Sequence, residues 1–75
     1  MQVQEDLLTE VVDAILRYLA SHPDAADTSE GIAKWWLPTD RGIDTEAVLS
    51  ALARLEAQGL VHRRINADHH VLYSR

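Results

Sequence analysis

The stretch "AVLSALARLEAQGLVHRR", from Ala47 to Arg64 of this 75-residue chain, decides the fold. Leucines recur in it at helical spacing as far as Gly59, and beyond that point the apolar residues follow the period of a strand. Asp44 lies where an N-cap is expected, and Gly59 where a helix end needs a left-handed backbone. The pattern predicts a helix over 45–58 that leads directly into a β-strand. The predicted buried stripe of this helix consists of Val48, Leu49, Leu52 and Leu55.

Two more helices are predicted before this stretch. Aliphatic residues between Leu7 and Leu19 recur at spacings of three and four, which predicts a helix over about 4–21. Its apolar arc is wide, so either the small domain covers it on two sides or it is the seam of a dimer. The second helix is expected over 28–37, between a capping box formed by Asp27 with Glu30 and the proline after Leu37.

A β-hairpin is predicted over about 60–75, where two runs of β type flank the letters "NAD". With a three-residue loop, Arg63 faces Val71 and Val61 faces Tyr73. One face of the hairpin then carries Val61, Ile65, Val71 and Tyr73. The other face carries His62, Arg64 and His70.

This order of elements resembles the winged helix-turn-helix family. The residues that carry the resemblance are Ala33 in the second helix and the pattern L-x-x-L-x-x-x-G-L-V from Leu52 to Val61. The resemblance implies one α+β, mainly α, domain over 1–75, with three helices and a C-terminal hairpin wing. It says little about function, because this fold has many roles. The loop "LPTDRGI" over 37–43 is longer than the tight turn common in DNA-reading members.

Composition excludes several classes of protein. The chain has no cysteine, so it forms neither a disulfide nor a thiolate metal site. Neither a signal peptide nor an apolar run of the roughly 18 residues that span a bilayer is visible, so a cytoplasmic protein without a membrane role is expected. No catalytic constellation or phosphate-binding loop is apparent. We therefore expect no enzymatic activity, no cofactor and no small-molecule substrate.

The outer face of the third helix bears on whether the protein binds DNA. In DNA-binding members this helix enters the major groove, where base reading favours arginine, lysine, asparagine and glutamine. Here the outer face is expected to carry Glu46, Ser50, Ala53, Arg54 and Ala57, of which only Arg54 suits a phosphate or guanine. The composition favours a regulatory protein-interaction module that docks on a protein partner or self-associates.

The alternative is a DNA-binding transcriptional regulator that uses the third helix and a basic wing. The net charge of the chain is −5, but residues 60–75 carry three arginines against one aspartate. The candidate phosphate contacts are Lys34, Arg41, Arg54, Arg63 and Arg64. Because affinity for DNA grows with the number of such contacts, this scattered set predicts weak binding per monomer.

Trp35 and Trp36 are adjacent, so they cannot lie on one helical face. Trp36 follows the core register of the second helix. Trp35 is then partly exposed, either lying over the neighbouring loop or wing, or serving as an anchor of the protein interface.

The histidines of the hairpin, His62, His69 and His70, admit three interpretations. They are polar positions of a wing, or they are a charge switch that strengthens anion binding at acidic pH, or they hold zinc together with Asp68. Their spacing matches no structural zinc pattern, so we expect no metal.

Overall fold

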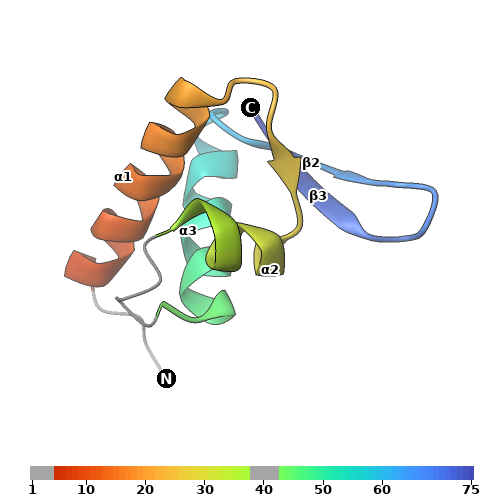
Figure 1. Ribbon diagram of the computed structural model, residues 1–75. Coiled ribbons are helices and arrows are strands. Elements are labelled where there is room, and N and C mark those ends of the chain that lie inside the picture. The colour runs from red at the N-terminus through yellow and green to blue at the C-terminus, as the bar shows by residue number, and fades with distance from the viewer. Residues whose placement is uncertain (1–4, 38–42) are drawn as a thin grey trace.

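Helices pack around one aliphatic core in the computed structural model, which describes residues 5–37 and 43–75. The helical segments are α1 (Glu5–Ser21), α2 (Ser29–Gly31), the π-helical turn η1 (Ile32–Trp36) and α3 (Thr45–Ala57). Figure 1 shows α1 beside α3, with α2 and η1 in front of α3. The predicted α+β, mainly α, fold with three helices and C-terminal strands is confirmed.

A small antiparallel sheet closes one end of the helices. Its strands are β1 (Ala26–Asp27), β2 (His62–Ile65) and β3 (Val71–Ser74), in the spatial order β1-β3-β2. The sequence pattern did not predict β1, which pairs Ala26 with Ser74 and Asp27 with Tyr73. The hairpin of β2 and β3 extends beyond the helices (Figure 1). This arrangement is compatible with a winged helix.

The buried face of α3 differs from the predicted stripe at one position. Leu49, expected in the core, is 43% exposed, so that prediction is wrong. The side chains that α3 buries are Ala47, Val48, Ala51, Leu52 and Leu55. At helical spacing, Ala47 and Ala51 lie on the flank of this stripe opposite to Leu49, so the centre of the buried face is displaced away from Leu49.

The predicted capping box at the start of α2 is also wrong by one residue. The N-cap is Thr28, whose hydroxyl accepts a hydrogen bond from the Gly31 N–H at 3.1 Å. Asp27 belongs to β1, and its carboxylate accepts from the Thr28 N–H at 2.8 Å. Because pairing with β3 holds Asp27 in the sheet, the helix begins one residue later, and Glu30 no longer lies at the third helical position.

Of the two tryptophans in the π-helical turn η1, one is buried and the other is exposed. Trp36 is buried and its ring stacks on that of Tyr18 from α1, with centroids 4.7 Å apart. The ring of His22 also stacks on Tyr18, at 4.2 Å. Trp35 points away from this stack and is 70% exposed, so the expected division between a core and a surface tryptophan is confirmed.

Gly59 ends α3 in the predicted left-handed conformation, with φ of 74°. The Leu60 N–H donates to the Leu55 carbonyl and the Gly59 N–H to the Glu56 carbonyl, both at 3.0 Å, which is the Schellman pattern. Nothing lies within 4 Å of where a Cβ of residue 59 would be, so only the backbone conformation requires glycine.

We therefore expect Gly59→Ala to lower the free energy of unfolding by about 1 kcal/mol, because L-residues other than glycine pay that much in this region. Gly59→Asn is the matched control and is expected to lose less, since asparagine tolerates the left-handed region. Urea unfolding followed by circular dichroism measures both. Equal stability of the alanine variant and the parent protein would contradict this account of the helix end.

Five residues, 66–70, separate β2 from β3, but the Asn66 N–H bonds to the His70 carbonyl, which leaves a three-residue loop over 67–69, one residue later than predicted. Asn66 organises it: its side-chain oxygen accepts from the N–H groups of Asp68 and His70, at 2.9 and 3.0 Å. His69 takes the left-handed position, with φ of 64°. This is a type I turn followed by a bulge, with histidine in the place where glycine is usual.

The register of the hairpin changes because the loop lies one residue later than predicted. Arg63 lies opposite Tyr73, and Ile65 lies opposite Val71, so the predicted pairings of Arg63 with Val71 and of Val61 with Tyr73 are wrong. The shift is two residues, which keeps every side chain of the paired strands on its predicted face. His70 lies beside Asn66 at the loop, whereas His62 lies opposite Ser74, so these two histidines are at opposite ends of the hairpin.

Candidate interaction surfaces

The outer face of α3 is apolar and acidic. Glu46, Ala53 and Ala57 are exposed there, as expected, whereas Ser50 and Arg54 are half-buried on its flank. Leu49 adds an exposed leucine that the sequence pattern had assigned to the core. A helix presenting alanines, a leucine and carboxylates offers few groups that a nucleic-acid groove would bind.

Trp35 on η1 is the second candidate contact. It is the most exposed of the large apolar side chains in the described residues, and the Lys34 ammonium lies 5.8 Å from its ring centroid. Lysine over an indole face is a cation–π arrangement that leaves the opposite ring face open to a partner. Such a ring has the chemistry of an interface hot spot.

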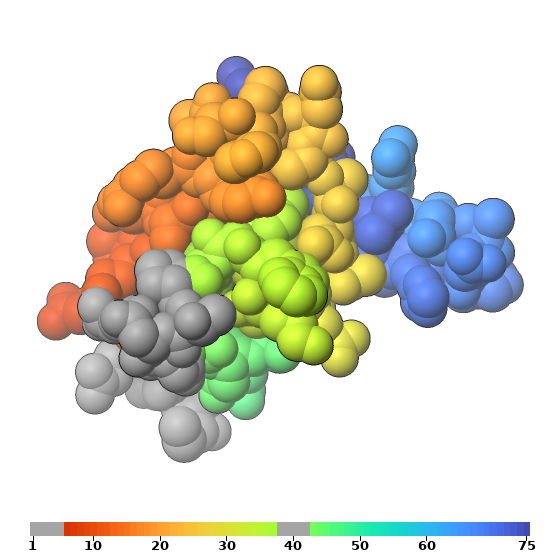
Figure 2. All heavy atoms as spheres, in the orientation of Figure 1, coloured from red at the N-terminus to blue at the C-terminus, as the bar shows by residue number. Residues whose placement is uncertain are grey.

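These two candidates lie on different helical segments, η1 and α3. The buried face of α3 packs against α1, α2 and η1, so its outer face points away from them. In Figure 2 the atoms of α2 and η1 form part of the near surface, and the first residues of α3 are visible below them.

The basic residues proposed as phosphate contacts are also dispersed. Arg63 on β2 pairs with Glu56 of α3, with Nε to Oε2 at 3.5 Å, and Lys34 lies over Trp35. Arg64 is exposed on the opposite face of β2, and Arg41 lies outside the described residues. An exposed ion pair is worth only about 0–1 kcal/mol, so a phosphate could replace Glu56 as the partner of Arg63.

The histidines do not assemble a metal site. In the part of the chain that the structure describes, no group of three histidine or acidic side chains could hold an ion. None of the described helices is long and apolar enough to cross a membrane.

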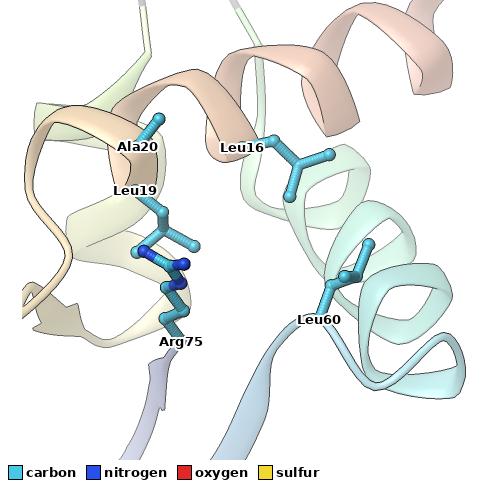
Figure 3. Close-up of a pocket in the computed structure, with 5 residues that line it drawn as sticks. All are labelled: Leu16, Leu19, Ala20, Leu60 and Arg75. Atoms are coloured by element: carbon cyan, nitrogen blue, oxygen red, sulfur yellow. The ribbon is translucent and has the colours of Figure 1, made fainter.

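An apolar hollow of about 250 Å³ lies on the flank of α1, where the dimer alternative places a seam. Figure 3 shows Leu16 and Leu60 pointing toward each other across it, with the Arg75 guanidinium beside Leu19. Leu60 is 44% exposed. It follows the glycine that ends α3 and lies outside the helical period, so the sequence pattern did not predict this exposure. This surface extends the half-buried flank of α1 that carries Val12 and Leu16.

Comparisons with protein-family models, with curated proteins and with solved structures found no match to this chain.

Proposed function

We propose that this protein is a non-enzymatic interaction module of the winged helix-turn-helix type, which binds another protein rather than a DNA groove. The observation that carries the proposal is the outer face of α3, where Leu49, Ala53 and Ala57 are exposed beside the carboxylate of Glu46. In a groove-reading helix, carboxylates near the N-terminus face phosphates and repel them.

Trp35 is the proposed anchor for the partner. A ring that is 70% exposed buries a large apolar area when a partner covers it. Hot spots of this kind carry most of the binding free energy of an interface. Because apolar burial is not screened by salt, binding through Trp35 persists at ionic strengths that remove charge-driven binding.

The first test of the proposal uses ¹⁵N-labelled protein titrated with mixed-sequence duplex DNA at low salt. Amides of α3 are expected to keep their chemical shifts throughout the titration. Salt-reversible shifts that cluster on Asp44–Arg54 together with the hairpin would instead support the DNA-binding regulator, and the proposal would be wrong.

The second test identifies the anchor by capture from an extract of the protein's own host. The parent protein is expected to retain a partner at high salt, and Trp35→Ala is expected to lose it, at least about tenfold in affinity for a hot-spot truncation. Leu60→Ala is the matched control, since Leu60 is exposed on another surface and its removal should leave capture unchanged. Retention by Trp35→Ala would exclude Trp35 as the anchor.

A further inference from the structure

Strand β2 forms an open edge of the sheet. In the order β1-β3-β2 one side of β2 pairs with β3, and no described strand pairs with the other side. All four of its side chains are exposed. Figures 1 and 2 show the hairpin projecting from the body of the molecule, so a partner can approach this edge.

The hydrogen-bond pattern shows which backbone groups face the open side. The Asn66 N–H donates to the His70 carbonyl at 2.9 Å, so this pair is hydrogen-bonded. Pairs alternate along an antiparallel ladder, and the pairs Ile65–Val71 and Arg63–Tyr73 are therefore the ones without mutual hydrogen bonds. It follows that the N–H and C=O groups of Ile65 and Arg63 point away from β3.

The side chains at this edge combine an apolar floor with positive charge. Ile65 is 67% exposed and lies opposite the half-buried Val71, which packs against the core. Together with Arg63 and Arg64 they line a hollow of about 460 Å³. An apolar side chain fits against the floor, and a carboxylate one position along an incoming strand then lies on the face that carries Arg64.

Charge decides what kind of strand can bind. A second copy of β2 would bring arginines opposite arginines, and like charges directly opposite each other destabilise a strand pair. An acidic strand instead brings carboxylates opposite these arginines, and opposite charges stabilise a strand pair. The protein already shows this attraction within its own chain, where Arg63 holds the Glu56 carboxylate.

We propose that β2 binds an extended acidic segment of another protein by strand addition. The segment hydrogen-bonds to the backbone of Arg63 and Ile65, places an apolar side chain over Ile65 and Val71, and places carboxylates beside Arg64 and His62. This surface is distinct from Trp35 and from α3, so the inference stands independently of the protein-binding role proposed for them.

The test uses a capped synthetic peptide of alternating valine and glutamate residues with the ¹⁵N-labelled full chain. Saturable shifts are expected to centre on residues 62–65. At about 90% saturation, amide exchange at Arg63 and Ile65 is expected to slow about tenfold, because exchange then proceeds only from the free fraction. Slowed exchange at these outward-pointing amides reports strand pairing, which attraction between charges alone does not produce.

Matched peptides and variants separate backbone pairing from charge. A peptide N-methylated at its valines keeps every charge but cannot pair, and is expected to bind at least about tenfold more weakly.

Ile65→Pro removes one outward donor without breaking a β2–β3 bond, whereas Ile65→Thr retains the donor and is expected to lose only a few-fold in affinity. Arg64→Glu is expected to weaken binding about tenfold. If Ile65→Pro fails to fold, the N-methylated peptide decides the question with the unaltered protein.

Several results would overturn the inference. Equal binding of the N-methylated peptide, or binding without slowed exchange, would show attraction of charge only. Absence of binding at millimolar peptide would exclude the edge as a site for acidic strands. Tighter binding of mixed-sequence duplex DNA than of the peptide at the same salt, with shifts on the same residues, would assign the wing to nucleic acid instead.

Discussion

Leu55→Ala is expected to lower the free energy of unfolding by about 3 kcal/mol, within the 2–5 kcal/mol range of buried leucine truncations. Leu55 is fully buried in the last turn of α3 and belongs to the same core cluster as the buried residues of α1. A domain of this size has a total stability on the order of 5 kcal/mol, so the variant is expected to be partly unfolded at room temperature.

The matched control for this prediction is Leu49→Ala, which removes the same atoms from the same helix. Because Leu49 is 43% exposed, its truncation is expected to cost less than about 1 kcal/mol. Urea unfolding monitored by circular dichroism compares the two variants. Equal losses would mean that Leu49 is as buried as the sequence pattern suggested, and that the described face of α3 is incorrect.

The second large effect is expected at Gly31. Alanine normally stabilises a helix by about 1 kcal/mol relative to glycine. A Cβ at residue 31, however, would overlap the carboxylate of Asp27, which β1 and the Thr28 N–H hold in place. We therefore expect Gly31→Ala to lower the free energy of unfolding by about 1–3 kcal/mol, the usual effect of overpacking.

A double-mutant cycle isolates the cause of this loss. In an Asp27→Ala background the overlap is gone, and Gly31→Ala is expected to be neutral or stabilising. Thermal or urea unfolding of the four proteins gives the coupling energy. Additive effects of the two substitutions would show that the carboxylate moves aside freely, contrary to the expectation.

Local signals predicted the helices well, because their ends are set by neighbouring residues. The Asp44 carboxylate accepts a hydrogen bond from the Ala47 N–H at 2.9 Å, as predicted for an N-cap. Gly59 has the positive φ predicted for the residue that ends the helix. Strand β1 could not be predicted, since two residues carry no period and only the distant β3 makes them a strand. The same pairing moved the N-cap from Asp27 to Thr28.

The candidate surfaces were predictable only in part. Adjacency of two tryptophans was enough to place Trp35 outside the core, because one helical face cannot hold both. The exposure of Ile65 was not predictable, because alternation along a strand says which face a residue is on but not where the core beneath that face ends. The register depends in turn on the Asn66 side chain, which closes a loop that lacks glycine.

The two tryptophans also give the molecule a pair of built-in fluorescent probes. Trp36, stacked on Tyr18 in the interior, emits from an apolar environment and can receive excitation energy from that tyrosine. Trp35 emits from water, where soluble quenchers reach it. With Trp35 replaced by phenylalanine, emission reports the packing of the core. In the parent protein, protection of Trp35 from a quencher reports the arrival of a partner, without any attached label.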